Sequence, residues 1–361
     1  MIKSLAYLLL FAIGVSAAPV LVAPSDTGIV YIGRWDHTDP KAAVGDWPGI
    51  YFKAAFQGTG VEARLDGRNV FEAWIDGQKE ATLAVSDSAQ WFQVAQGLSN
   101  DRHVLTLYKR SESQTNATRF LGLRLAEGAT MLKAPSRSPR RVEFIGDSYT
   151  VGYGMEAPGH EPAGLDEDSL VLFSTNAVQA FGPLVARGFG AEYQLNAFSG
   201  RGLVRNLNGM EPQKPYGYFY ESTLMSQKNT KGTSPIYDFN SWHPQVVVIG
   251  LGINDFQGNA PYADTAKFDA AYHALLTQIR IKHPGVKFIL CSTKVWPTEA
   301  LVPRVQAIAA AEEAKGNHDV TVFTYGSENT GLYFHPSAHD HENIARELRP
   351  VLARVAGWLS R

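Results

Sequence analysis

The sequence predicts two domains, an antiparallel β-sandwich over residues 18–126 and an α/β domain with a doubly wound parallel sheet over residues 141–361. A chain of 361 residues fits two domains of ordinary size. Short alternating strands separated by turn residues fill the first part, and apolar runs alternate with helical segments in the second. Hydrophobic residues make up 45% of the chain and charged residues 19%, so it can bury a substantial core.

The first domain is expected to be a sandwich because its strands lie about ten residues apart and have turn residues between them. Asp66-Gly67 and Asp76-Gly77 are typical turn dipeptides. Alternation of apolar and polar residues indicates strands with one buried face, as in an antiparallel sandwich. The predicted strands cover residues 30–33, 50–56, 61–65, 71–75, 91–94 and 103–108.

The second domain follows residues 127–140, a polar segment with two prolines and a basic end that is typical of a linker. Its apolar runs are expected to be buried parallel strands, and helices are expected between and after them. In such a sheet the active site lies at the carboxyl ends of the strands. The runs cover residues 142–145, 246–251, 286–291 and 320–323, and the helices residues 265–282, 301–315 and 337–359.

Residues 1–17 predict a secretory signal peptide. Lys3 precedes a mostly apolar stretch at residues 5–15, within the roughly 7–15 residues of a signal core, and small residues follow at 15–17. A membrane anchor is the alternative, but a span needs about 20 apolar residues. We therefore expect a secreted or periplasmic protein with no membrane attachment after cleavage.

Charge and cysteine content exclude several classes. The net charge of −2 gives no basic field for nucleic acid, so no nucleic-acid partner is expected. The single cysteine, Cys291, excludes an intrachain disulfide and a zinc site built on thiolates. Asn116-Ala117-Thr118 matches the N-glycosylation acceptor pattern.

Four residues carry the chemistry of acyl transfer. Ser148, in Gly-Asp-Ser, follows the first apolar run of the second domain and is a candidate nucleophile, although such a serine can also simply cap a turn. His335, in His-Pro, lies before the last helix and could accept the proton of the serine. The main-chain N–H of Gly200 and the side-chain amide of Asn254 could hold the oxyanion, together with the N–H of Ser148.

This set is similar to the SGNH/GDSL hydrolases, whose four motif residues map onto Ser148, Gly200, Asn254 and His335 across residues 141–361. Further segments resemble carbohydrate esterase family 2, and this likeness covers nearly all of the chain after the leader. It implies a jelly-roll N-terminal domain and an acetyl esterase that acts on plant hemicellulose such as xylan or glucomannan. The segments include Gly33-Arg34-Trp35, Trp47-Pro48-Gly49, Gly58-Thr59-Gly60, Gly152-Tyr153-Gly154 and the run from Ser199 to Asn206.

One position departs from the superfamily pattern. Many members have an aspartate three residues before the catalytic histidine, and Leu332 stands there in this chain. We therefore expect a Ser148–His335 dyad, with the imidazole held by a main-chain carbonyl or by a carboxylate from elsewhere, for which Asp255 and Asp340 are candidates.

Other residues near these motifs have competing interpretations. His335 and His339 are four residues apart and could bind a metal on one helix face, but Pro336 suits the first position of a helix and places His335 before it. Tyr149 and Trp296 are candidate walls of a sugar-binding cleft, and core packing is the alternative for both.

The sequence therefore predicts a secreted serine esterase that removes acetyl groups from acetylated xylan or glucomannan and needs neither cofactor nor metal. One alternative is the same chemistry on another ester, as in a GDSL lipase, a thioesterase or a peptidoglycan deacetylase. Another is a carbohydrate-binding protein on an inactive hydrolase scaffold. The expected partner is an acetylated plant polysaccharide or oligosaccharide.

Overall fold

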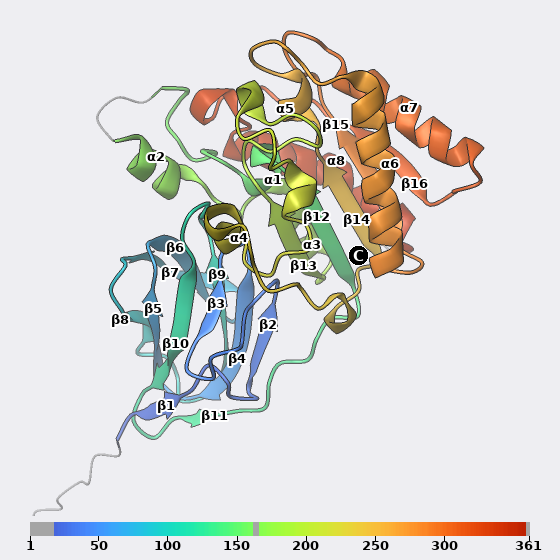
Figure 1. Cartoon of the computed structure of the whole chain (residues 1–361). Coiled ribbons are helices and arrows are strands. Elements are labelled where there is room, and N and C mark those ends of the chain that lie inside the picture. The colour runs from blue at the N-terminus through green and yellow to red at the C-terminus, as the bar shows by residue number, and fades with distance from the viewer. Residues whose placement is uncertain (1–17, 162–165, 359–361) are drawn as a thin grey trace, which may run out of the picture.

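The computed structural model describes residues 18–161 and 166–358. The expected leader, residues 1–17, lies outside the described residues. Figure 1 shows the antiparallel sheets of the N-terminal half beside a parallel sheet flanked by helices in the C-terminal half. The fold class expected from the sequence, a β-sandwich followed by a doubly wound α/β domain, is confirmed.

Two antiparallel sheets form the sandwich around one apolar core. The first contains, in spatial order, β1 (Val20–Val22), β10 (Thr118–Leu125), β5 (Gly60–Asp66) and β8 (Gln90–Gln96), and β3 (Ala43–Gly45) also pairs with β10. The second contains β11 (Thr130–Met131), β4 (Tyr51–Gln57), β9 (Arg102–Lys109), β6 (Asn69–Ile75) and β7 (Gln78–Val85), and β2 (Ile29–Ile32) pairs with β4. Phe120 of the first sheet and Phe52 of the second are wholly buried with ring centroids 4.3 Å apart, so the inner faces of the sheets interlock.

The two Asp-Gly turns connect strands in different ways. Asp76 and Gly77 both have positive φ, 51° and 83°, as a tight hairpin requires, and they join β6 to β7 within one sheet. Asp66-Gly67 instead carries the chain from β5 in the first sheet to β6 in the second. The expected linker also contains structure, because Thr130 and Met131 pair with β4 as strand β11.

Five parallel strands form the sheet of the second domain. Their spatial order is β13 (Glu192–Ala197), β12 (Arg141–Gly146), β14 (Val246–Gly250), β15 (Lys287–Ser292) and β16 (Val320–Thr324). The chain moves outward from β12 in both directions, so the loops that follow β12, β13 and β14 meet at one edge of the sheet.

Helices cover both faces of this sheet, which explains why its strands are apolar on both sides. Alternate residues such as Phe144 and Val248 face α3 (Phe181–Gly188) and α8 (Ala338–Ala356). The residues between them, such as Ile145 and Val247, face α6 (Thr265–Lys282) and α7 (Leu301–Ala314). The shorter helices are α1 (Ser148–Val151), α2 (Glu167–Ser174), α4 (Met225–Lys231) and α5 (Ile253–Phe256), with 3₁₀ turns η1 (Leu207–Gly209), η2 (Tyr216–Tyr218), η3 (Phe239–Ser241) and η4 (Leu332–Phe334). Within the described residues, no helix combines the length and the apolar character needed to cross a membrane.

Buried aromatic and charged side chains join the two domains. The ring of Tyr51 on β4 lies 5.1 Å from that of Tyr193 on β13. Arg34, which follows β2, is wholly buried, and its guanidinium lies 3.4 Å from the carboxylate of Glu143 on β12. A buried charge without a partner costs several kcal/mol, so this ion pair ties the sandwich to β12 of the parallel sheet.

Candidate active site

Ser148 lies at the carboxyl end of β12, where the sequence places it. It is the first residue of α1, and the carboxylate of Asp147 accepts a hydrogen bond of 3.1 Å from the N–H of Tyr149. Asp147 therefore caps the helix and fixes the turn that carries the serine. Ser148 is 7% exposed.

His335 lies directly against this serine although it is almost two hundred residues further along the chain. Its Nε2 is 2.9 Å from Ser148 Oγ, and its Nδ1 is 2.8 Å from the carbonyl oxygen of Leu332. Because a carbonyl can only accept, Nδ1 carries the hydrogen and Nε2 is the acceptor for the serine hydroxyl. The acceptor that orients His335 is thus the main-chain carbonyl of the residue that replaces the usual aspartate.

The turn before His335 has an uncommon backbone. Tyr333 and Phe334 both have positive φ, 48° and 61°, a region that bulky side chains rarely adopt, at a cost on the order of 1–3 kcal/mol each. Two contacts to His160 hold the turn: its carbonyl accepts the N–H of Tyr333 at 2.9 Å, and its ring stacks on Phe334 with centroids 4.0 Å apart. These contacts fix the direction in which His335 points.

The surroundings of His335 favour its neutral form. Burial lowers its pKa to about 4, and the carbonyl of Leu332 opposes this shift without cancelling it. The imidazole is therefore unprotonated at neutral pH and free to accept a proton.

In the first part of the loop after β13, residues 198–205, the N–H of Gly200 is the one main-chain donor without an acceptor in the described structure. From Phe198 to Arg205, every other main-chain N–H donates to an acceptor among the described residues. Gly200 has a φ of 79°, which glycine adopts readily, and its carbonyl accepts the N–H of Leu207 at 2.9 Å. In the described part of the chain the N–H of Ser148 also has no acceptor, so both groups are available to a ligand.

Asn254 joins the serine turn to the Gly200 loop. It follows β14 in α5, and its Nδ2 donates to Asp147 Oδ2 at 3.3 Å and to the carbonyl of Arg201 at 3.0 Å. Burial, reinforced by the charge of Asp255, raises the pKa of Asp147 to about 8. Both hydrogens of the amide thus have protein acceptors, and the contact with Asp147 is the longer.

The two carboxylates considered as orienters of His335 serve other loops. Asp255 accepts the N–H groups of Leu203, Val204 and Arg205 at 2.8–2.9 Å and so holds the loop that contains Gly200. Asp340 accepts the N–H groups of Glu328 and Ser337 and completes the capping box that Ser337 begins at the start of α8.

The remaining candidates lie in different settings. Tyr149 is buried, its hydroxyl donates to the carbonyl of Phe334 at 3.3 Å, and its ring lies 5.5 Å from that of His335. Trp296 is 79% exposed in the loop after β15. Of the other histidines, His339 is exposed, whereas His341 is buried and accepts the N–H of Phe181. No group of three or more potential metal ligands is assembled anywhere in the described ranges.

Sequence reasoning missed one contact at the site. Glu112, from the turn between β9 and β10 of the sandwich, accepts the N–H of Ser199 at 2.8 Å. Its neighbours are polar turn residues, typical of a solvated loop, so no local pattern distinguishes it. Only the docking of the two domains brings Glu112 next to Gly200.

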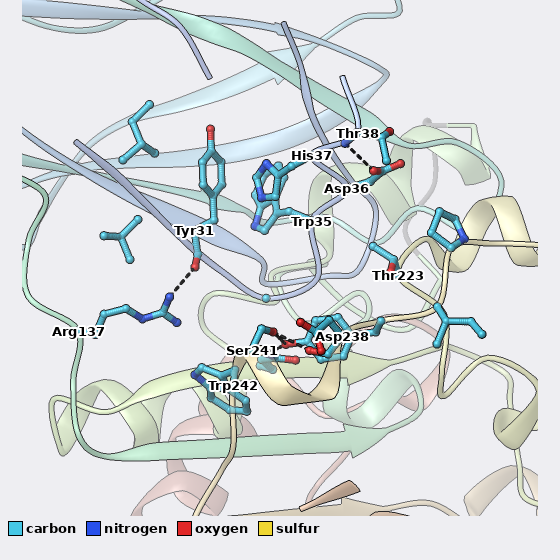
Figure 2. A pocket seen from close by; sticks show the side chains of 17 residues that line it. Tyr31, Trp35, Asp36, His37, Thr38, Arg137, Thr223, Asp238, Ser241 and Trp242 are labelled. Atoms are coloured by element: carbon cyan, nitrogen blue, oxygen red, sulfur yellow. Dashed lines mark hydrogen bonds between the residues drawn. The ribbon is translucent and has the colours of Figure 1, made fainter. Parts of the chain in front are cut away.

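A sizeable cavity lies away from these residues. It has a volume of about 670 Å³ and opens between the sandwich and the second domain. Figure 2 shows Tyr31, Trp35 and His37 on one side of it and Asp238 and Trp242 on the other. Neither Ser148 nor His335 lines it.

Two family models match the chain. The model described as Carbohydrate esterase 2 N-terminal matches residues 31–135, and that of the GDSL-like Lipase/Acylhydrolase family matches residues 144–356. The resemblance recognised in the sequence is therefore confirmed for both halves.

Individual proteins extend this likeness over most of the chain. An acetylxylan esterase / glucomannan deacetylase of Cellvibrio japonicus is 33% identical over 328 residues, 88% of this chain and 87% of that protein. The cellulase/esterase CelE of Acetivibrio thermocellus is 30% identical over 92% of this chain and 40% of its own length. A family two carbohydrate esterase from Clostridium thermocellum, solved in complex with cellohexaose, has a TM-score of 0.83 with 28% identity, over 92% of this chain and all of that chain.

Proposed function

Because the chain belongs to family 2 of the carbohydrate esterases, with the catalytic domain of the GDSL-like lipases and acylhydrolases, we propose that it removes acetyl groups from acetylated xylan or glucomannan by a serine mechanism. The observation that carries the mechanism is the 2.9 Å contact between Ser148 Oγ and His335 Nε2. The substrate class is supported by the names of the relatives.

In the proposed first step, Ser148 Oγ attacks the acetyl carbonyl while His335 Nε2 takes the hydroxyl proton. Burial, which lowers the pKa of His335 to about 4, keeps this nitrogen unprotonated beforehand. The carbonyl of Leu332 holds Nδ1–H and stabilises the imidazolium as it forms. The His335 proton then passes to the departing sugar oxygen, leaving an acetyl-enzyme that water hydrolyses by the reverse proton transfers.

The proposed oxyanion donors are the N–H groups of Ser148 and Gly200 and the amide of Asn254. The two main-chain groups need no rearrangement, because no acceptor in the described chain occupies them. Asn254 would give up one existing hydrogen bond to donate to the oxyanion. We propose that it gives up the longer one, to Asp147 at 3.3 Å. The shorter bond, to the carbonyl of Arg201, would keep the amide in place.

We further propose that the protein is exported and that residues 1–17 are removed. The apolar stretch and the small residues at 15–17 support this proposal. N-terminal sequencing of the exported protein is expected to begin at Ala18. An exported chain that retains Met1 would contradict cleavage.

The decisive experiment measures acetate release from acetylated xylan and acetylated glucomannan by the wild-type protein and by Ser148→Ala. We expect release by the wild type and a loss of at least about 10³-fold in the variant. Ser292→Ala is the matched control, because Ser292 is also a buried serine at the carboxyl end of a strand in this sheet but bonds to Thr324.

Other outcomes would redirect the proposal. Activity that survives Ser148→Ala would exclude the serine mechanism. Cleavage of small acetyl esters without release from either polymer would move the substrate to another ester, such as a lipid or peptidoglycan. Binding of the polymers without hydrolysis of any ester would favour a carbohydrate-binding protein.

A further inference from the structure

The main chain of Ser199 is one of the points at which the sandwich domain contacts the second domain. Glu112 Oε1 accepts its N–H at 2.8 Å, and Gln114 Nε2 approaches its carbonyl oxygen at 3.5 Å. The first is a strong hydrogen bond with a carboxylate acceptor, and the second is at the long limit of such bonds. Both main-chain polar groups of Ser199 are thus contacted by one short segment of the other domain.

That segment is itself held in place. Ser111 and Ser113, on either side of Glu112, both donate their hydroxyls to the side-chain oxygen of Asn69, which is wholly buried at the start of β6. Gln114 Nε2 also lies 3.3 Å from Glu112 Oε2. The carboxylate is therefore fixed on the sandwich before it reaches Ser199.

Ser199 immediately precedes Gly200, whose N–H is free. The position of that N–H depends on where the main chain of Ser199 is held, because glycine itself restricts the backbone little. Displacement of a reacting or stabilising group by about 1 Å can cost on the order of 10²-fold in rate. A bond that holds Ser199 therefore also governs the geometry of the oxyanion donor.

We propose that Glu112 is a positioning residue for catalysis: through the N–H of Ser199, the sandwich domain holds the Gly200 N–H where the oxyanion forms. This inference rests on the proposed function, which makes Gly200 an oxyanion donor. It assigns the N-terminal domain a part in turnover that is separate from polymer binding.

The charge of Glu112 is compensated nearby. Burial raises its pKa, whereas the N–H of Ser199 and the ammonium of Lys109 oppose that shift. Lys109 is wholly buried at the end of β9, and its Nζ donates to the carbonyl of Ser111. Burial lowers the pKa of Lys109 to about 7, and its larger charge interaction is with Asp46, so it offsets the negative charge of Glu112 only in part.

The test compares Glu112→Ala with Glu112→Gln, since glutamine keeps one oxygen that can accept the N–H of Ser199. With p-nitrophenyl acetate, which is too small to need the sandwich for binding, we expect Glu112→Ala to lower kcat about 10–100-fold and leave KM within about twofold. Glu112→Gln is expected to retain kcat within about threefold.

Glu62→Ala is the matched control. Glu62 is also a carboxylate of the sandwich held by hydrogen bonds, but its partner is the guanidinium of Arg124 on the neighbouring strand β10. It should lower stability while leaving kcat within about threefold of the wild-type value.

A second readout isolates the oxyanion site. Phenylboronic acid adds to a serine oxygen and presents a tetrahedral, negatively charged group to the donors. Its inhibition constant should rise in Glu112→Ala by about the factor lost in kcat, because both report complementarity to the tetrahedral state. A merely structural weakening would leave the inhibition constant of the folded enzyme unchanged.

The inference is overturned if Glu112→Ala retains kcat, or if Glu62→Ala loses as much kcat as Glu112→Ala. If Glu112→Ala does not fold, Glu112→Asp replaces it, because aspartate is shorter by one methylene and moves the carboxylate away from Ser199. A wild-type kcat together with wild-type boronate inhibition in Glu112→Asp would also overturn the inference. Ser148→Ala, measured alongside, keeps the two proposals apart. Full activity in Ser148→Ala would reject the serine mechanism. If Ser148→Ala is inactive and Glu112→Ala has normal turnover, only the role of Glu112 is rejected.

Discussion

The imidazole Nδ1 of His335 lies 2.8 Å from the main-chain carbonyl oxygen of Leu332, three residues earlier in the same turn. The orienting acceptor therefore belongs to the backbone and is present whatever side chain occupies position 332. His335 is therefore oriented by a neutral group, without the negative charge that an aspartate would add.

Leu332→Ala should therefore reduce stability much more than turnover. The side chain of Leu332 is wholly buried, so truncation should lower the free energy of unfolding by about 2–5 kcal/mol, whereas kcat should stay within about fivefold because the carbonyl remains. Urea unfolding and assays on a small acetyl ester measure the two effects. A folded variant with kcat lowered 10³-fold would show that the side chain itself is needed for catalysis.

The acid limb of the pH–rate profile should lie unusually low. His335 acts only when neutral, and burial lowers its pKa to about 4 from an ordinary value near 6.5. We expect kcat/KM to be flat through the weakly acidic range and to fall about tenfold per pH unit below pH 4. A midpoint near 6.5, measured where circular dichroism shows intact protein, would contradict this.

Stability should also fall with acid, because His341 is buried in its neutral form. Its Nδ1 accepts the N–H of Phe181 at 3.2 Å, and burial lowers its pKa to about 3. The unfolded chain binds this proton near pH 6.5 and the native chain does not, so the free energy of unfolding should fall between pH 6.5 and 3 by at most about 1.4 kcal/mol per pH unit. His341→Gln should be less stable at neutral pH but should show a weaker pH dependence in urea titrations. An unchanged dependence would exclude this residue as a source of it.

Asn254→Ala should cost on the order of 10²–10³-fold in kcat, the usual effect of losing one oxyanion donor. Asn254→Asp should be at least as harmful, because it removes the donors and adds a carboxyl group beside Asp147, whose pKa burial already raises to about 8. Steady-state kinetics with a small ester measure both variants. Wild-type turnover in Asn254→Ala would remove Asn254 from the proposed set of donors.

Trp296→Ala should affect polymers and not small esters. The indole is 79% exposed in the loop after β15, as a stacking surface for sugar rings would require, and no part of it is needed for acetyl transfer. We expect KM for acetylated xylan or glucomannan to rise about three- to tenfold, with p-nitrophenyl acetate hydrolysis unchanged. Ile281→Ala on α6 is the control, since Ile281 is 71% exposed and apolar. Equal effects of the two substitutions would deny Trp296 a specific role.

The sequence predicted most of the fold because the elements near the core have clear periodicity. The helix over residues 265–282 has the same bounds in the structure as α6. Five sandwich strands were not predicted, namely β1, β3, β7, β10 and β11. Three of them have only two or three residues, and the two long ones lack a clear pattern for physical reasons. β7 is largely exposed and so has no apolar run, and β10 contains Gly122, whose φ of 127° accompanies a register shift that interrupts the alternation.

The residues of the candidate site also fall into those that the sequence predicts and those that it does not. Ser148 and His335 lie in short motifs at the ends of regular elements, so their approach to within 2.9 Å follows from the topology of a parallel sheet. A main-chain acceptor such as the Leu332 carbonyl has no residue-type signature, and the sequence left it as one of several options. Glu112 could not be found at all, because its contact depends on how one domain docks on the other.

The bond between Glu112 and Ser199 and the ion pair between Arg34 and Glu143 both cross from one half of the chain to the other. A gene rearrangement that joined residues 141–361 to a different N-terminal domain would keep both Ser148 and His335. The N–H of Ser199 would nevertheless lose its acceptor, Glu112, and Glu143 would be buried without its partner Arg34. Replacing either half would therefore require a compensating change in the other, at Ser199 or at Glu143.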